Sequence, residues 1–177
     1  WVVYNSMAWI SWDDRPTTSL PDNLPTIYSE SSPTIEKPYT VTLVDNEEAV
    51  AQFISKFASD PGIIGIDVET DLAGAEPNEM ADALVGVGVS IGNDCFFGFA
   101  DFDPWMVALR DTLSNVSWIG HNSKYDLCVL RGHGIIPGPL VGDGMLAAYL
   151  RGEPNARLKD VVQRRLDVRM ITYNEIV

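Results

Sequence analysis

The chain has 177 residues, 46% of them hydrophobic, which is enough for one globular domain with a buried core. No apolar run approaches the roughly 18 residues of a membrane helix, and no charged-then-apolar leader opens the sequence, so we expect no membrane partner. Cys95 and Cys128 form no recognisable motif and favour a reducing compartment such as the cytoplasm. Because the chain begins at Trp1 rather than at a methionine, we expect an excised or processed piece.

The formal net charge of −13 argues at first against a nucleic-acid partner, because neutralisation of phosphates usually supplies most of that affinity. The charge is unevenly distributed, since residues 124–169 hold eight of the 12 basic residues and only five acids. These basic residues are Lys124, Arg131, Arg151, Arg157, Lys159, Arg164, Arg165 and Arg169. This excess of basic residues is consistent with a basic rim beside a functional site. Solvated helix faces produce the same excess.

Residues 1–38 contain five of the 11 prolines, many Ser and Thr, and three tryptophans, without a sustained period. We expect an extended arm whose tryptophans pack on this domain or on a neighbouring one, and an aromatic platform for nucleic acid is the less favoured alternative. The globular domain is expected over residues 39–177. It should open with a strand over residues 39–44, followed by a helix that Asp45 and Glu48 begin as a capping box.

Residues 62–74 read Gly-Ile-Ile-Gly-Ile-Asp-Val-Glu-Thr-Asp-Leu-Ala-Gly, which predicts a buried strand. Side chains on a strand alternate between its faces, so Asp67 and Glu69 should project from the same face with their carboxylates close together. Like charges about 5 Å apart repel by roughly 3 kcal/mol at an effective dielectric near 20, and a divalent cation would offset this repulsion. Paired carboxylates suit Mg²⁺ or Mn²⁺ better than zinc, which prefers His and Cys.

Two other interpretations of this strand stay open. The acids could lie on the exposed face of an edge strand, where acidic residues are ordinary. Asp67, Glu69 and Asp71 also have the one-three-five spacing of a calcium-binding loop, but Leu72 stands where that loop needs glycine, which argues against it.

The next segments predict a β-hairpin, a helix and a parallel strand. Apolar residues on one face of the first hairpin strand alternate with small residues on the other: Val85, Val87, Val89 and Ile91 against Gly86, Gly88 and Ser90. A Gly-Asn-Asp turn leads to the second strand, over residues 95–100. Asp103 and Pro104 begin a helix, and the strand expected over residues 116–120 should lie parallel to an existing one, because a helical crossover precedes it.

A further helix should open in the stretch Gly-His-Asn-Ser-Lys-Tyr-Asp at residues 120–126, with Asn122 or Ser123 as its cap residue. Asp126 falls in the first turns, where the helix dipole stabilises an acid by about 0.3–1 kcal/mol. It is also placed to act as a third carboxylate that points at the acidic strand. Asp143 should cap the helix that follows.

His121 and His133 lack the spacing of metal ligands and are expected to make structural or local hydrogen bonds. A last helix is expected over residues 157–166, which carry Leu158, Val161 and Val162 on one face.

Taken in order, these motifs resemble the 3′→5′ exonuclease domain of family A (polymerase I type) DNA polymerases. Asp-Val-Glu-Thr at residues 67–70 is similar to the first exonuclease motif, and Ile-Gly-His-Asn-Ser-Lys-Tyr-Asp at residues 119–126 to the second. Residues 143–150, 158–161 and 171–176 resemble connecting segments of the same domain. The resemblance implies an α/β, ribonuclease H-like fold of three layers. Its mixed sheet has three antiparallel strands followed by parallel strands, with helices on both faces.

The resemblance implies a two-metal site in which Asp67, Glu69 and Asp126 are the catalytic acids and bind two Mg²⁺ or Mn²⁺ ions. Asp67 and Glu69 would bind the metal that holds the attacking water, Asp67 would bridge to the second metal, and Asp126 would help to hold that second ion. Such a pair of metals generates hydroxide near neutral pH and stabilises both oxygens of an in-line displacement.

The implied substrate is a single-stranded 3′ end of DNA, recognised by backbone contacts and stacking rather than by base identity. Asn122 matches a contact to the terminal nucleotide, and Thr70 and Leu72 lie where the strand edge meets the end of the substrate. A polymerase domain, or other polypeptide beyond Val177, is the implied covalent partner.

The third motif of the family, Tyr-x-x-x-Asp, supplies a fourth carboxylate and is expected after the segment with which this chain ends. Tyr149 and Glu153 have this spacing, but we expect a core tyrosine followed by a helix end there. Tyr173 has Val177 at the acid position. We therefore expect a fragment of a longer polymerase that, alone, has weak metal affinity and little or no hydrolysis.

Three functional hypotheses stay open. The chain is part of a proofreading exonuclease attached to a polymerase, or a non-catalytic module that organises or binds nucleic acid, or a free-standing RNA-trimming exonuclease of the same superfamily. The connecting segments favour the first.

Overall fold

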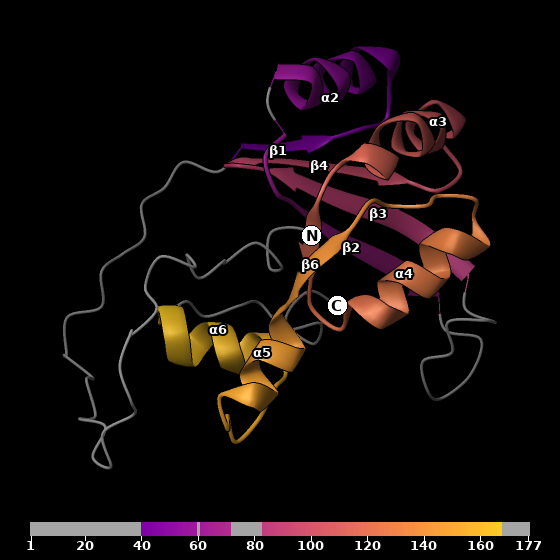
Figure 1. Cartoon of the computed structure of the whole chain (residues 1–177). Helices are drawn as coiled ribbons and strands as arrows, with labels where there is room; N and C mark the ends of the chain where they lie inside the picture. Colours follow the sequence, from indigo (N-terminus) through magenta and orange to yellow (C-terminus); the bar gives the residue numbers. More distant parts are fainter. Residues whose placement is uncertain (1–39, 60, 72–82, 168–177) are drawn as a thin grey trace.

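The computed structural model describes residues 40–59, 61–71 and 83–167, and Figure 1 shows their arrangement. In chain order the elements are β1 (Thr40–Leu43), α2 (Glu47–Ser59), β2 (Ile64–Asp71), β3 (Ala83–Ile91), β4 (Asp94–Phe99), α3 (Asp103–Thr112), the 3-10 turn η2 (Leu113–Asn115), β5 (Trp118–Gly120), α4 (Ser123–Gly132), β6 (Leu140–Asp143), α5 (Gly144–Leu150) and α6 (Leu158–Leu166). The arm expected over residues 1–38 lies outside these ranges. Within them, no helix has the length and apolar character that crossing a membrane requires.

The strands form one mixed sheet in the order β1-β4-β3-β2-β5-β6. β3 is antiparallel to both β2 and β4, whereas β5 is parallel to β2 and β6 is parallel to β5. This confirms the α/β class and the expected run of three antiparallel strands followed by parallel ones. The sequence does not predict β6, because only Leu140 and Val141 separate Pro139 from Gly142 and so short an apolar run indicates no strand.

Helices cover both faces of the sheet, as expected (Figure 1). On one face, Phe53 of α2 meets Trp105 of α3 edge to face, with 4.8 Å between ring centroids, and it also contacts Phe96 of β4 at 5.4 Å. The strand register continues this apolar layer from Phe96 to Val89 and then to Ile66 of β2. The apolar side of β2 therefore faces α2 and α3, while α4 packs against β2 and β5 on the other face.

The start of α2 corrects the predicted cap. The side chain of Asn46, not that of Asp45, accepts the backbone N–H of Ala49, at 3.0 Å. Asp45 instead accepts a hydrogen bond from the Asn46 amide at 2.7 Å. Asp and Asn are about equally good cap residues, so the pattern alone could not choose between these two neighbours.

A β-bulge corrects the predicted alternation on β3. The pairing with β2 shifts register between Glu69 and Thr70, which leaves Val85 without a partner opposite it. As a result Leu84 is buried and Val85 is 39% exposed, so the assignment of Val85 to the apolar face is wrong. Bulges often re-aim side chains beside active sites, and this one directly follows Glu69.

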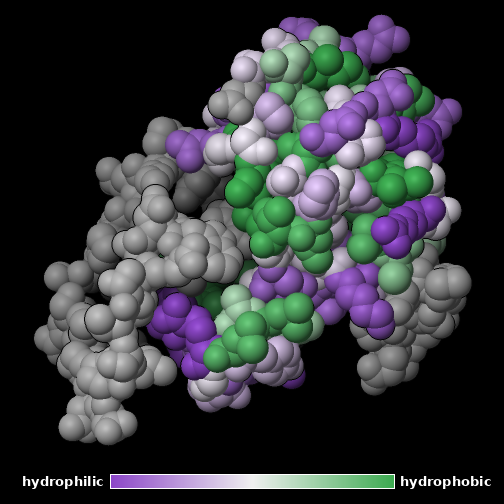
Figure 2. Space-filling model, in the orientation of Figure 1, coloured by the Kyte–Doolittle hydropathy of each residue, from purple (hydrophilic) through white to green (hydrophobic). Residues whose placement is uncertain are grey.

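The helix α5 also differs from expectation, because it exposes apolar side chains. Leu146, Tyr149 and Leu150 are 56%, 62% and 89% exposed, and Figure 2 shows hydrophobic surface over this helix. The prediction that Tyr149 belongs to the core is therefore wrong. The reason is that α5 packs on β6 and α6, beyond the end of the central sheet.

Gly98 of β4 lies directly under a buried indole, and this contact gives a first testable prediction. A Cβ at position 98 would stand 2.4 Å from Cδ1 of Trp105, whose side chain is fully buried and has no room to move. We expect Gly98→Ala to lower the free energy of unfolding by about 1–3 kcal/mol in urea denaturation. Gly132→Ala is the control, because a Cβ there meets nothing within 4 Å. Equal losses in the two variants would contradict the packing argument.

Candidate active site

Asp67 and Glu69 lie on the face of β2 that points away from the core. The register places Asp67 opposite Gly88 and Glu69 opposite Gly86, so the neighbouring positions of β3 carry no side chains. At Gly86 the ring of Phe97 fills that space, since an added Cβ would be 2.5 Å from its Cζ. The edge-strand interpretation is wrong, because β2 lies inside the sheet between β3 and β5.

Asp126 approaches these acids from α4 and is only 4% exposed. The backbone N–H of Val68, the residue between the two acids of β2, donates a hydrogen bond to its carboxylate. This donor is available because β5 pairs only with Ile64 and Gly65 and stops short of Val68. The atom Oδ2 of Asp126 is buried and has no hydrogen-bond partner among the described residues.

The three acids share a poorly solvated site, and their pKa values respond accordingly. Burial, and after it the charge of Glu69, raises the pKa of Asp67 to about 7. Burial also raises the pKa of Glu69 to about 6. For Asp126 burial is again the first cause and the charge of Asp67 the second, and the pKa rises to about 8. Among the described residues no Lys or Arg side chain lowers these three pKa values, and carboxyl groups whose pKa values are raised together are typical of functional sites.

The chemistry of these donors fits a hard divalent cation. Carboxylate oxygens are the ligands that Mg²⁺ and Mn²⁺ prefer, and a cation would supply both the missing charge and a partner for Oδ2 of Asp126. In residues 40–59, 61–71 and 83–167, however, no three His, Cys, Asp or Glu side chains are placed closely enough to hold an ion. The described residues therefore supply suitable ligands but do not form a complete metal-binding site.

Two of the three residues expected to bind substrate fall within the described ranges. Asn122 is exposed immediately before α4, and Thr70 lies near the end of β2, whereas Leu72 falls outside the described residues. The hydroxyls of Thr70 and Tyr125 share a hydrogen bond of 2.6 Å. Sequence reasoning did not single out Tyr125, although its place directly before Asp126 in the second motif could have drawn attention to it.

The Thr70–Tyr125 hydrogen bond ties the end of β2 to α4, and we expect it to contribute to stability. Thr70→Val and Tyr125→Phe should each lower the free energy of unfolding by about 0.5–1.5 kcal/mol. The double variant should lose less than the sum of the two single losses, because both substitutions remove the same bond. Urea denaturation of the three variants measures this coupling. Strictly additive losses would show that the bond contributes nothing.

The start of α4 is held from outside the helix. Asn122 occupies the cap position but makes no cap hydrogen bond with its side chain, and Ser123 is already the first helical residue. The prediction of Asn122 as the cap residue is therefore confirmed, although its side chain does not accept the usual cap hydrogen bond. The backbone N–H of Ser123 instead donates to the carboxylate of Asp143, at 2.8 Å.

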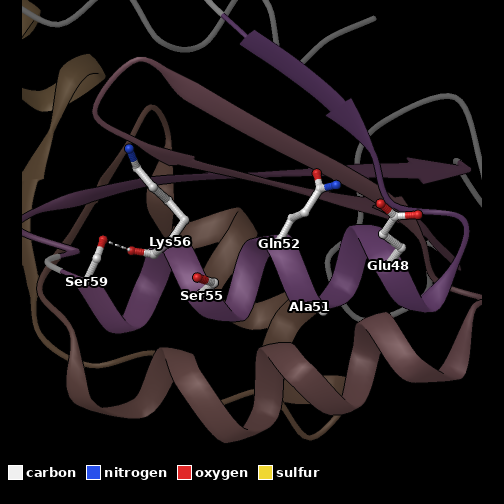
Figure 3. Close-up of a pocket in the computed structure, with 6 residues that line it drawn as sticks. All are labelled: Glu48, Ala51, Gln52, Ser55, Lys56 and Ser59. Atoms are coloured by element: carbon white, nitrogen blue, oxygen red, sulfur yellow. Dashed lines mark hydrogen bonds between the residues drawn. The ribbon is translucent and has the colours of Figure 1, made fainter.

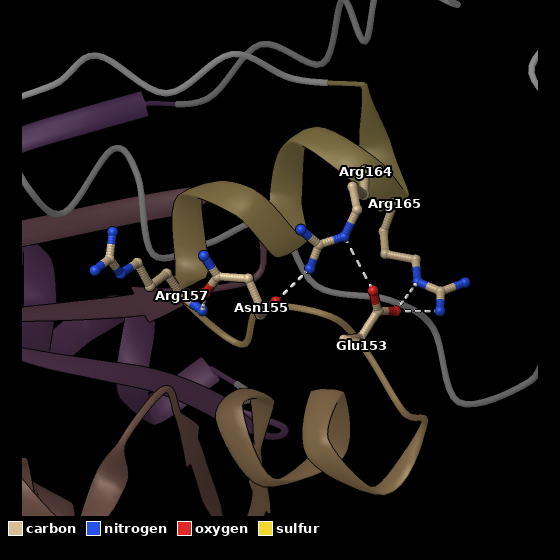
Figure 4. Close-up of polar contacts among 5 residues, drawn as sticks. All are labelled: Glu153, Asn155, Arg157, Arg164 and Arg165. Atoms are coloured by element: carbon tan, nitrogen blue, oxygen red, sulfur yellow. Dashed lines mark hydrogen bonds and ion pairs between the residues drawn. The ribbon is translucent and has the colours of Figure 1, made fainter.

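Glu153 is committed to an ion-pair network of its own (Figure 4). Its carboxylate binds Arg164, with 3.0 Å between Oε2 and Nε, and also Arg165, while its side chain is only 6% exposed. These pairs join the segment after α5 to α6, and they use two of the eight basic residues that were considered for a rim. Glu153 is therefore not free to act as a fourth metal-binding carboxylate with Tyr149.

A shallow pocket on α2 has no connection with the acids. Figure 3 shows its lining along a single helix: Glu48, Ala51, Gln52, Ser55, Lys56 and Ser59. The ammonium of Lys56 pairs with Asp94 at 2.5 Å. Because α2 covers the face of the sheet opposite to the acids, we assign this pocket no part in the chemistry.

Comparison with known proteins identifies the family of this chain. A family model described as 3′-5′ exonuclease matches residues 41–176. The DNA polymerase I of Chloroflexus aurantiacus is 27% identical over 159 residues, which cover 82% of this chain. The chain spans only 16% of the length of that relative.

Solved structures of nucleases share the fold. Trypanosoma brucei RNase D in complex with RNA U12 is 12% identical with a TM-score of 0.62, over 75% of this chain and 48% of that chain. The catalytic core of RRP6 from Trypanosoma brucei is 14% identical with a TM-score of 0.59, over 77% and 37%. Brucella melitensis NrnC bound to pGG is 20% identical with a TM-score of 0.51, over 76% and 65%. Since the family model covers most of the sequence and the sheet has the matching topology, the chain belongs to the 3′-5′ exonuclease family and has a ribonuclease H-like fold.

Proposed function

We propose that this chain is the front part of a proofreading 3′→5′ exonuclease attached to a DNA polymerase, acting on single-stranded 3′ ends of DNA. The similarity to DNA polymerase I over 82% of the chain supports the polymerase context. The observation that carries the proposal is the buried carboxylate of Asp126. Its Oδ2 has no partner in the described part of the chain, and the charges of Asp67 and Glu69 act on it.

Asp67, Glu69 and Asp126 would hold two divalent cations, Mg²⁺ or Mn²⁺, which supply a hydroxide nucleophile and neutralise charge on the phosphate when they are bound. The contribution of the protein is to hold the three acids in position. An interior strand fixes Asp67 and Glu69, and the N–H of Val68 fixes Asp126 against that strand. Asp126 is buried and Asp67 and Glu69 are half-buried, which limits their contact with water and strengthens their interaction with a cation.

Substrate binding would use contacts at the end of the strand rather than a long track of phosphates. Asn122 is exposed immediately before α4, the helix that carries Asp126, and Thr70 lies near the end of β2, so we expect both to meet a terminal nucleotide. The net charge of −13 is unfavourable for tracking a long backbone. We therefore expect binding to depend only weakly on salt, with few phosphates neutralised.

Two other functions are kept because particular observations favour them. Trimming of RNA is favoured by the shared fold of Trypanosoma brucei RNase D, which was solved with RNA U12. A non-catalytic module is favoured by the absence, in the described ranges, of three side chains close enough to hold an ion.

Single-stranded DNA and RNA of one sequence, labelled at the 5′ end, distinguish these functions when each is incubated with Mn²⁺ and the longer protein of which this chain is proposed to be the front part. Stepwise loss of nucleotides from the 3′ end of DNA, abolished in Asp67→Asn, is the expected result. Faster shortening of RNA would replace the DNA assignment by RNA trimming. Failure to cleave either strand, combined with failure to bind Mn²⁺, would support the non-catalytic module. A 3′-phosphorylated strand is the control, because a blocked end should resist an exonuclease but not a contaminating endonuclease.

A further inference from the structure

Asp143, the last residue of β6, makes an unusual set of contacts for a helix cap. Its Oδ1 accepts the backbone N–H groups of Met145 at 2.8 Å and Leu146 at 3.2 Å, which caps α5 as expected. The same Oδ1 accepts the N–H of Asn122 at 3.3 Å, and Oδ2 accepts that of Ser123 at 2.8 Å. One carboxylate therefore holds the first turns of two helices.

The topology explains how one side chain reaches both helices. β5 and β6 are parallel neighbours, with Gly120 paired to Asp143, and each strand leads at once into a helix. The N-termini of α4 and α5 thus meet at the same edge of the sheet, where their backbone N–H groups have no partners within the helices. A carboxylate between them satisfies both sets of donors and complements both dipoles.

Asp143 binds the backbone of Asn122 and Ser123 at the start of α4, the helix that carries Asp126. Asn122 has a left-handed backbone conformation, with φ of 65° and ψ of 39°. Asn tolerates this conformation better than most residues, and the side chain of Asn122 makes no cap bond that would hold it there. The carboxylate of Asp143 accepts the N–H groups of Asn122 and Ser123 and so holds the backbone of this turn. One helical turn later, the same helix presents Asp126 to β2.

We propose that Asp143 is a positioning residue of the exonuclease site. It sets the turn at Asn122 and the start of α4, and through them the placement of Asn122 and Asp126, without itself touching the substrate or the reacting atoms. This inference rests on the function proposed above, because it concerns how the same site is held together.

Asp143→Ser tests this role directly. A serine hydroxyl is a good cap for α5 but has one oxygen, so it cannot also hold both N–H groups of α4. Asp143→Asn is the second variant, since its single carbonyl oxygen keeps the shape while its amide cannot accept from the second helix. Asn46→Ser is the matched control: it also exchanges a helix cap for serine, at α2 on the other face of the sheet.

Two measurements on the 177-residue chain separate positioning from stability: the affinity for Mn²⁺, titrated by electron paramagnetic resonance, and the amide proton shifts of Asn122 and Ser123. We expect Asp143→Ser to weaken Mn²⁺ binding by about 10–100-fold, the loss that is typical when a residue that orients a metal ligand is removed. The Mn²⁺ affinity of Asp143→Asn should lie between that of Asp143→Ser and that of the unaltered chain. The two amide shifts should move upfield in both variants, and Asn46→Ser should leave the affinity and these shifts unchanged.

Each outcome bears on the proposal. Unchanged Mn²⁺ affinity in a folded Asp143→Ser or Asp143→Asn variant overturns the positioning role of Asp143. The exonuclease proposal survives that result if the unaltered chain binds Mn²⁺ in a way that depends on Asp67. An equal loss of affinity in Asn46→Ser also overturns the positioning role, because the effect would then be general destabilisation. If Asp143→Ser does not fold, Asp143→Asn alone decides. Absence of Asp67-dependent binding in the unaltered chain would overturn both proposals together.

Discussion

Replacing Asp67 by Asn is expected to abolish the stabilisation of this chain by Mn²⁺. Asp67 lies on an interior strand, and its carboxylate interacts electrostatically with both Glu69 and Asp126. A ligand at 100 times its dissociation constant stabilises the folded state by about 2.7 kcal/mol, and the variant should lose this increment. Thermal unfolding at about pH 8, with and without Mn²⁺, measures it.

Asp71→Asn is the matched control for this prediction. Asp71 is the exposed last residue of the same strand, and it belongs to the one-three-five set of a calcium-binding loop but not to the proposed site. Stabilisation by Mn²⁺ should survive in Asp71→Asn. If both variants lose it equally, the ligands are those of the calcium-type loop and the proposed set of acids is wrong.

Local patterns were sufficient to predict how β2 presents its acids. The side-chain period of a strand is fixed by its backbone, so Ile64, Ile66 and Val68 on one face require Asp67 and Glu69 on the other. The flanking glycines and the apolar run also indicated an interior strand, which the sheet order confirms. These features depend on neighbouring residues only, and the sequence contains all of that information.

Sequence reasoning expected Asp126 to point at the acidic strand, but it could not predict which atoms of distant segments meet. The meeting of Asp126 with the N–H of Val68 depends on β5 ending early, a property of the pairing that no pattern in residues 118–120 reveals. The hydrogen bond from the start of α4 to Asp143 depends on β6, a strand that the sequence does not predict. The bulge at Val85 likewise arises from the partner strand, because the alternation of β3 reads as unbroken by itself.

The chain without metal is expected to be less stable at about pH 8 than at about pH 5, because of Asp126 and its acidic neighbours. The pKa of Asp126 rises from 3.8 to about 8 in the folded state, so the folded chain binds more protons than the unfolded chain throughout this window. Stability therefore falls as pH rises, by up to about 1.4 kcal/mol per pH unit for one such proton. Urea denaturation in the presence of EDTA, repeated across this range, measures the slope.

Asp126→Asn should flatten this slope and make the metal-free chain more stable than the unaltered one at about pH 8. The amide oxygen can still accept from the N–H of Val68, while the buried charge and its repulsion from Asp67 are gone. Asp101→Asn, which removes a charge from the exposed turn after β4, is the control and should keep the original slope. An unchanged slope in Asp126→Asn would show that its carboxyl is not strained by burial. A flatter slope together with loss of Mn²⁺ binding would show that one buried acid destabilises the fold in order to serve the site, as is usual for groups kept for function rather than for stability.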